Sequence, residues 1–167
     1  MINGDWSSDV CSSDLMRLYE SPINHDEMIN DAYPAKKNEE AGALVFEARY
    51  IEKLADEEDP NSKYQVVDIV ENFNLQPYDM KRAAFMGWAK AFMPMRKKQL
   101  EESNPGAVDE FMANAKKFVA FIAKNFAQFE IYMGQSGDPD DMLMFAREED
   151  GKTYFYFLEL ACDNFKC

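Results

Sequence analysis

The clearest pattern of hydrophobic positions in this chain has the period of an α-helix. Between residues 105 and 125, apolar side chains recur at steps of one, three or four residues and therefore line one face of a helix. Asn104 suits the N-cap and Pro105 the first helical position. The pattern predicts a helix over about 105–125. The stripe consists of Val108, Phe111, Met112, Ala115, Phe118, Val119, Ile122 and Phe126.

A second helical stripe lies just upstream. It begins after Asp79, another residue type found at helix caps, and includes Phe85, Trp88, Ala89 and Phe92. Because the connection at 103–106 is short, the two helices are expected to pack as an antiparallel hairpin over about 79–126. Pro94 lacks the N–H of a helical residue, so a kink or a break is expected there.

Strand-like runs flank the helical part on both sides. Runs rich in β-branched and aromatic residues cover 43–51, 64–73, 128–133, 142–147 and 153–160. The acidic segment 54–63 between the first two is typical of a surface loop, and Asp150-Gly151 is a hairpin signal. Strands, a helical hairpin and further strands predict an α+β domain with a mostly antiparallel sheet.

Residues 1–15 do not share these patterns. Ser-Ser-Asp occurs twice among them, and the run 5–15 resembles a sequencing adapter translated in one frame. We interpret 1–15 as a non-native prefix, with a native tail as the alternative, and 16–167 as one domain.

Composition restricts the classes of partner. The formal net charge is −13, which disfavours nucleic acid and anionic membranes and favours cations and basic protein surfaces. The chain has 3 cysteines, which form no disulfide framework, so a reducing cytoplasm is the expected location. Cys167 at the end of the chain suits either an inert thiol or an intermolecular disulfide in a dimer; otherwise a monomer is expected.

Candidate metal and catalytic residues are few. Asp138, Asp140 and Asp141 offer oxygen ligands for weak calcium binding, although their loop lacks the glycine and glutamate of an EF-hand; a solvated loop is the alternative. His25 is the single histidine and suits a hydrogen-bonded turn better than a zinc or catalytic site. With no nucleophile–base pair or phosphate loop evident, no enzyme activity and no tightly bound cofactor are predicted.

Two surface features of the helical hairpin suit protein partners. A basic patch on this acidic chain is predicted from Arg96, Lys97, Lys98, Lys116 and Lys117. A solvated helix face is the alternative for the patch. Several methionines of the hairpin suit either an adaptable groove or core filling: Met80, Met86, Met93, Met95 and Met112.

A series of short motifs in a fixed order resembles the translationally controlled tumour protein (TCTP) family. The first is Asn24-His-Asp-Glu-Met28, after a plausible start at Met16, and the second is Val67-Asp-Ile-Val70 before the hairpin. Each is weak alone, but their order and spacing over nearly all of 16–167 are specific. The others are Leu100-Glu-Glu102, Ala123-Lys-Asn-Phe126, 129–134 with Asp138-Pro-Asp140, Arg147-Glu-Glu-Asp-Gly151 and Lys166-Cys167.

The resemblance implies a β-tent domain, similar to a Rab chaperone, with a projecting helical hairpin. It also implies a non-enzymatic cytoplasmic protein that binds calcium weakly, associates with tubulin and microtubules, and supports growth, translation and survival through protein partners. The alternative is an exchange factor or chaperone for a small GTPase of the Rheb or Rab type, acting through Asp26 and Glu27. A capping turn with solvated charges is the other interpretation of that acidic pair.

The chain departs from the family pattern at three places. The Gly-Gly-Asn-Ala-Ser-Ala-Glu signature is replaced by Ala55-Asp-Glu-Glu-Asp-Pro-Asn-Ser62, in a shorter loop. Pro94 lies in the helix that the family connects with tubulin, and Pro34 follows Tyr33 where a lysine is usual. These departures affect the expected partners more than the expected fold.

Overall fold

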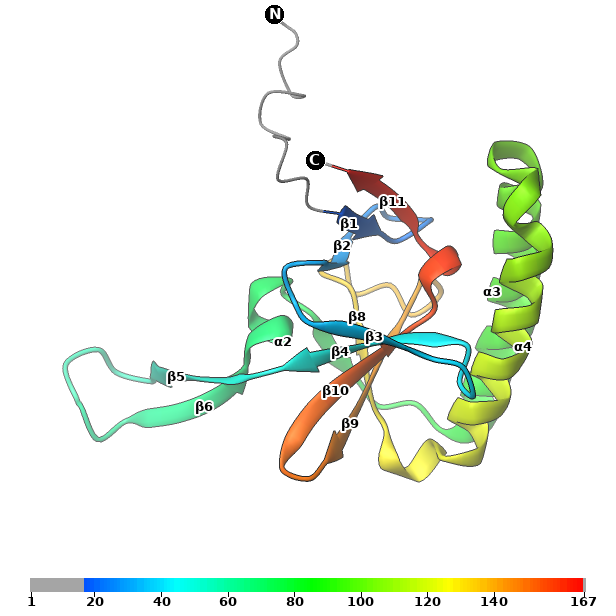
Figure 1. The fold of residues 1–167 in the computed structure, drawn as a ribbon. Helices are drawn as coiled ribbons and strands as arrows, with labels where there is room; N and C mark the ends of the chain where they lie inside the picture. Colours follow the sequence, from blue (N-terminus) through cyan, green and yellow to red (C-terminus); the bar gives the residue numbers. More distant parts are fainter. Residues whose placement is uncertain (1–16, 167) are drawn as a thin grey trace, which may run out of the picture.

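The computed structural model describes residues 17–166 of the chain, with side chains described up to 164. The predicted prefix 1–15, Met16 and Cys167 lie outside the described residues, so the adapter interpretation and the disulfide dimer stay predictions. Within the described part, an antiparallel β-structure packs against a pair of long helices at one side (Figure 1).

The main sheet has six strands, and every neighbouring pair in it is antiparallel. Asp150 and Gly151 connect two of its strands with φ values of 53° and 80°, which matches the left-handed turn that this dipeptide favours. In spatial order the strands are β3 (Ala35–Asn38), β4 (Ala43–Ala48), β10 (Lys152–Phe157), β9 (Met144–Glu149), β8 (Glu130–Met133) and β7 (Gln76–Tyr78).

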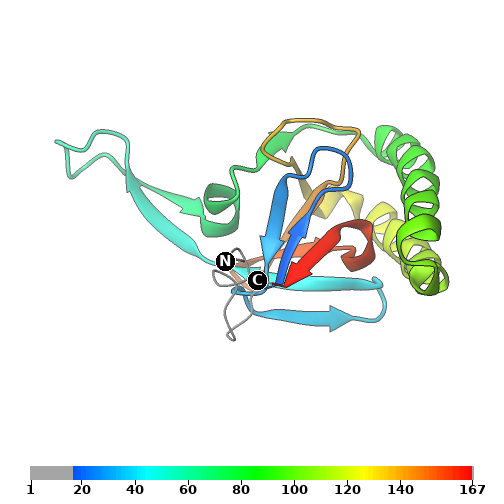
Figure 2. The ribbon, with the colours of Figure 1, turned by 90° about the horizontal axis from the view of Figure 1, so that it is seen from above.

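Two smaller sheets complete the β-structure. One joins the two ends of the described range in the order β11 (Asp163–Lys166), β1 (Arg17–Glu20) and β2 (Glu27–Asn30). The other is a two-stranded ribbon of β5 (Tyr50–Leu54) and β6 (Lys63–Val67), which projects from the body on the side opposite the long helices (Figures 1 and 2). The acidic segment predicted as a loop forms the tip of this ribbon.

The predicted helical hairpin is present, with different ends. It consists of α3 (Arg82–Ser103) and α4 (Val108–Lys124), joined by the 3₁₀ turn η1 (Pro105–Ala107). Neither Asp79 nor Asn104 caps a helix with its side chain: α3 begins after Lys81 and α4 after Ala107. None of the helices in the described range is long and apolar enough to cross a membrane.

Of the kink or break expected at Pro94, the break does not occur. Helix α3 continues through this proline, whose side chain is exposed. Phe92 and Met93 before it and Leu100 after it are all buried, so packing on both sides keeps the two segments in one helix. Tertiary packing here outweighs the loss of one backbone hydrogen bond.

Two predicted strands end earlier than their composition suggests. The run 43–51 is divided between β4 and β5, which belong to different sheets. The run 64–73 ends as a strand at Val67 and continues as the short helix α2 (Asp68–Asn72). Asp68 lies at this change, and its Oδ1 accepts the backbone N–H groups of Arg49 at 2.9 Å and Ile69 at 2.7 Å. Ile69, the next residue, is fully buried.

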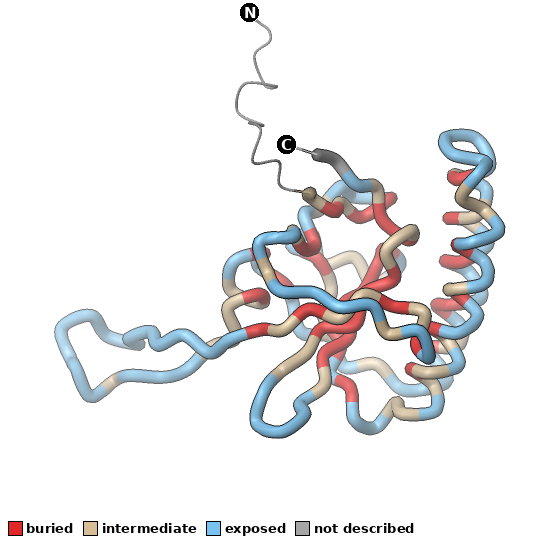
Figure 3. Tube along the Cα trace, viewed as in Figure 1, coloured by how far each residue is buried: buried red, intermediate tan, exposed pale blue. Residues whose placement is uncertain are grey.

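Buried residues lie on the strands of the main sheet and on both long helices (Figure 3), and aromatic side chains join these elements in the core. Phe145 on β9 is fully buried, and its ring centroid lies 5.6 Å from that of Phe85, 6.0 Å from Trp88 and 5.5 Å from Phe118. One sheet residue therefore contacts both long helices. The β3–β4 turn also presses on α4, because a Cβ at Gly42 would lie 2.7 Å from the carbonyl oxygen of Asn114.

Candidate functional site

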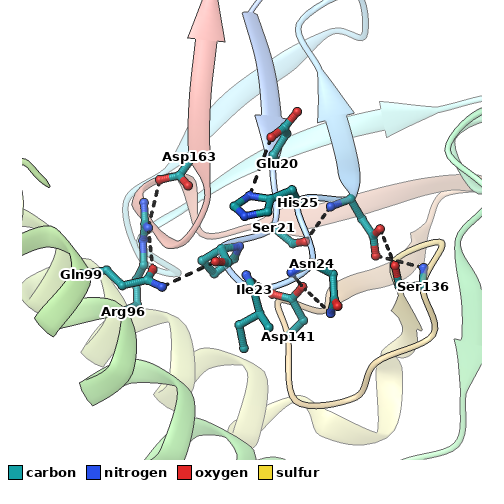
Figure 4. A network of polar contacts seen from close by, with 12 residues as sticks. Glu20, Ser21, Ile23, Asn24, His25, Arg96, Gln99, Ser136, Asp141 and Asp163 are labelled. Atoms are coloured by element: carbon teal, nitrogen blue, oxygen red, sulfur yellow. Dashed lines mark hydrogen bonds and ion pairs between the residues drawn. The ribbon is translucent and has the colours of Figure 1, made fainter.

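The acidic motif predicted to face a partner lies in the tight turn between β1 and β2 (Figure 4). Ser21 closes the turn: its backbone N–H donates to the Asp26 carbonyl at 2.9 Å, and its Oγ accepts the Asp26 N–H at 2.9 Å. His25 has a φ of 59°, which gives the turn its left-handed residue. The turn is therefore held in one shape by backbone and side-chain bonds.

Asp26 and Glu27 have different roles in this turn. Asp26 accepts two hydrogen bonds from Ser136, at 3.0 Å from the backbone N–H and 2.7 Å from the hydroxyl. Gly134 is packed so tightly here that a Cβ on it would lie 2.6 Å from Oδ2 of Asp26. The Glu27 side chain is exposed and has only a 3.5 Å contact with the amide of Asn30. Of the two carboxylates, Glu27 is the one available to a partner.

Asp141 links the same turn to the rest of the molecule through hydrogen bonds. It is 2% exposed, and its carboxylate accepts the backbone N–H groups of Ile23 at 3.2 Å, Asn24 at 2.8 Å and its neighbour Met142 at 2.8 Å. The Asn24 amide donates a further bond at 3.0 Å. The Asp141 carbonyl also accepts Trp88 Nε1 at 2.9 Å. One residue therefore connects the turn, the 134–143 loop and α3.

Two of the three predicted calcium ligands accept hydrogen bonds from within the protein. The Asp141 carboxylate is occupied by the four N–H donors just described, and Asp138 accepts the Asn24 amide and the Asp140 N–H at 2.8 and 2.9 Å. Only the exposed Asp140 carboxylate has no bond of this kind. Across residues 17–164, no group of three His, Cys, Asp or Glu side chains is arranged to hold a metal ion. The loop carboxylates act as internal acceptors.

The predicted basic patch is divided by the fold. Arg96 is 3% exposed; its guanidinium donates to the Leu160 carbonyl at 2.9 Å, to Gln99 at 3.0 Å and to Asp163 at 3.1 Å. It therefore connects α3 to the C-terminal strand and does not belong to the surface patch. The other four cations keep at least part of their side chains at the surface. Lys97 is half-buried, and Lys98, Lys116 and Lys117 are exposed.

Comparisons with known proteins identify the family of this chain. The model of the family described as translationally controlled tumour protein matches residues 16–162. The chain belongs to the translationally controlled tumour protein family. A homologue from Danio rerio is 32% identical and aligns over 91% of this chain and 100% of its own length, and one from Schizosaccharomyces pombe is 31% identical over 86% and 95%.

A solved TCTP structure shows the same fold. The translationally controlled tumour-associated protein of Schizosaccharomyces pombe has a TM-score of 0.77 and 26% identity, covering 90% of this chain and 99% of its own. The Caenorhabditis elegans TCTP, with a TM-score of 0.61 and 19% identity, shares the fold. The predicted family, the α+β class with its β-tent and the projecting hairpin are thereby confirmed.

The remaining candidate residues of this TCTP chain have modest environments. The His25 side chain is exposed and lies 4.0 Å from Glu20, a surface pair of little energetic weight. Burial raises the pKa of the Cys162 thiol well above its ordinary value, which keeps it protonated and unreactive. Neither residue adds reactive chemistry to the acidic turn.

Sequence reasoning missed the residues that hold the site. Asn24, Ser136 and Trp88 position the turn, although none of them was a candidate. The motifs at 24–28 and 138–140 are far apart in the sequence, and the fold brings them together, since the Asn24 amide donates to Asp138 at 2.8 Å. A signal did exist: small and polar residues beside both motifs are the types that form such turns.

Proposed function

We propose that this TCTP-family chain is a non-enzymatic, cytoplasmic interaction protein that associates with tubulin and microtubules through its helical hairpin, in support of growth, translation and survival. The observation that carries the proposal is the set of exposed lysines on a hairpin that projects from an acidic body. Lys98 on α3 and Lys117 on α4 are exposed, and tubulin presents an acidic surface to them. Weak calcium binding stays a prediction, because Asp138 and Asp141 also serve as internal hydrogen-bond acceptors.

Reversing two of these charges is expected to weaken microtubule binding. The double variant Lys98→Glu/Lys117→Glu should bind microtubules about tenfold less tightly, which corresponds to about 1.4 kcal/mol. Co-sedimentation with taxol-stabilised microtubules at several salt concentrations measures this. The matched control is Lys36→Glu/Lys63→Glu, which makes the same charge change at exposed positions of β3 and β6. Equal loss in both variants would leave only a net-charge effect and contradict the hairpin site.

A second candidate function rests on the exposed Glu27. We infer that this carboxylate, presented by a turn that Asp26 and Asp141 hold in place, can pair with a basic group on a small GTPase of the Rheb type. A positioned carboxylate near the nucleotide site could also displace a contact of the magnesium ion. The turn geometry supports this role for Glu27 and assigns Asp26 to positioning.

Nucleotide release tests this second candidate. If the chain promotes exchange, Glu27→Gln should lower the stimulated rate of release from a Rheb-type GTPase by about tenfold, because a neutral amide loses the charge-assisted contact. Release of a fluorescent guanine nucleotide is the measurement. Glu102→Gln, an exposed carboxylate on the hairpin, is the matched control and should leave the rate unchanged. Identical release with and without the unmodified chain would rule out exchange.

A further inference from the structure

An apolar groove runs between the two long helices. It has a volume of about 560 Å³, within the range of ligand-binding clefts, and all of its lining residues come from α3 and α4. Its position follows from the helical period: Met86 is next to Phe85, which packs on the sheet, and neighbouring helix residues point about 100° apart. The groove therefore lies away from the sheet. It is lined by Met86, Ala89, Lys90, Met93, Met112, Ala113, Ala115, Lys116 and Val119.

The floor and walls of the groove have different shapes. Ala89 and Ala115 are 6% and 3% exposed and form a shallow floor where the helices approach each other. Met112 is 38% exposed and is one of few large apolar side chains so exposed among residues 17–164. Methionine side chains adapt to irregular apolar surfaces and are frequent in grooves that accept helices. Three of the methionines noted in the sequence thus gather here: Met86, Met93 and Met112.

The charged side chains that line the groove are both positive. Lys90 on α3 and Lys116 on α4 are exposed and line it, one from each helix. Lys97 lies four residues after Met93 and continues the same side of α3. On these two helices, carboxylates occur only near the connection. Glu101 lies four residues after Lys97, and Asp109 lies three residues before Met112, so both continue the side of the groove. An approaching partner therefore meets apolar surface between two cations on a molecule that is otherwise strongly acidic.

We propose that this groove docks an amphipathic helix of a partner protein whose apolar stripe is flanked by carboxylates. Two antiparallel helices leave a seam that accepts a third helix through residues spaced at i, i+3, i+4 and i+7. The alanine floor permits close approach, and Lys90 and Lys116 pair with carboxylates on both sides of the stripe. Glu101 and Asp109 set the orientation, because they repel acidic residues at the connection end.

This inference goes beyond the proposed function and does not depend on tubulin binding. Lys98 and Lys117, the residues of the microtubule test, do not line the groove. Lys117 instead lies beside the β3–β4 turn, where its Cβ would be 3.1 Å from a Cβ at Gly42. If Lys98→Glu/Lys117→Glu does not weaken microtubule binding, the groove proposal still stands. If the groove binds no helix, the microtubule proposal still stands.

Binding of two designed peptides to the full chain tests the proposal. The probe is a 20-residue amphipathic helix with a leucine stripe flanked by glutamates, and the matched peptide replaces every glutamate with lysine. With methyl-labelled methionine, the acidic peptide should shift the Met86, Met93 and Met112 signals saturably at micromolar concentration. Met80 and Met95, which line a different surface cleft, should not shift. The lysine peptide should bind at least tenfold more weakly.

Variants of the groove sharpen the result. Met112→Glu and Lys90→Glu/Lys116→Glu should each weaken the acidic peptide at least tenfold, and both change exposed side chains, so folding is preserved. Lys98→Glu/Lys117→Glu makes the same charge change outside the groove and should leave the affinity unchanged. Equal binding of the two peptides, or shifts at Met80 and Met95 instead, would overturn the proposal. So would shifts of the groove methionines that depend on protein concentration alone, which would identify a second copy as the occupant.

Discussion

Replacing Phe145 with alanine is expected to lower the free energy of unfolding by about 3–5 kcal/mol, the usual cost of truncating a buried phenylalanine. Phe145 is fully buried on β9 and meets Phe85, Trp88 and Phe118 at once. The cavity would therefore open between the sheet and both long helices. For a domain of this size the melting temperature should fall by about 10 °C. Urea unfolding followed by circular dichroism measures the change.

The control is an aromatic residue that makes no such connection. Tyr64 on β6 is 46% exposed, so Tyr64→Ala should change the free energy of unfolding by about 0.5 kcal/mol or less. The contrast separates loss of the helix–sheet contact from a general loss of aromatic surface. Similar losses in the two variants would contradict the central role of Phe145.

Removing the buried carboxylate of Asp141 should cost about 3 kcal/mol, because it leaves one buried and two partly buried backbone N–H donors without their acceptor. In Asp141→Ala, the backbone N–H groups of Ile23, Asn24 and Met142 lose their partner. The turn that presents Glu27 should then loosen. Chemical denaturation gives the stability, and amide hydrogen exchange at Ile23 and Asn24 should become faster than in the unmodified chain.

Asp141→Asn should not rescue this defect. Both carboxylate oxygens accept N–H donors, so an amide places its NH₂ group against a donor whichever way it is turned. Asp140→Ala is the matched control one residue away, since the exposed Asp140 carboxylate accepts none of these bonds, and its stability should stay within about 0.5 kcal/mol. Unchanged exchange at Ile23 in Asp141→Ala would show that the turn is held by other contacts.

The acidic turn shows where sequence reasoning stops. Asp26 and Glu27 are adjacent carboxylates, and their residue types alone do not separate them; only the family resemblance favours the glutamate. The fold separates them through Ser136, more than a hundred residues away, which binds Asp26 and leaves Glu27 exposed. The same kind of distant contact withdraws Arg96 from the predicted basic patch, because Leu160 and Asp163 bind its guanidinium.

The helical boundaries show a related limit. Periodicity located both long helices, since a stripe of apolar residues must face the core whatever surrounds it. The residues at which the two helices begin, and whether Pro94 interrupts α3, depend on contacts with other parts of the fold. Buried residues on both sides of Pro94 hold α3 continuous, and the turn at Asp68 converts a strand-like run into a helix.

By itself, the sequence determined the family, the α+β class and the helical hairpin, because these follow from local periodicity and from motifs whose order can be read along the chain. The tertiary structure decided which charges are available. Asp138 and Asp141 became internal acceptors, Arg96 became a buried connector, and Glu27 and four lysines remained at the surface. Burial and hydrogen bonding depend on residues far apart in the chain, and only folding brings those residues together.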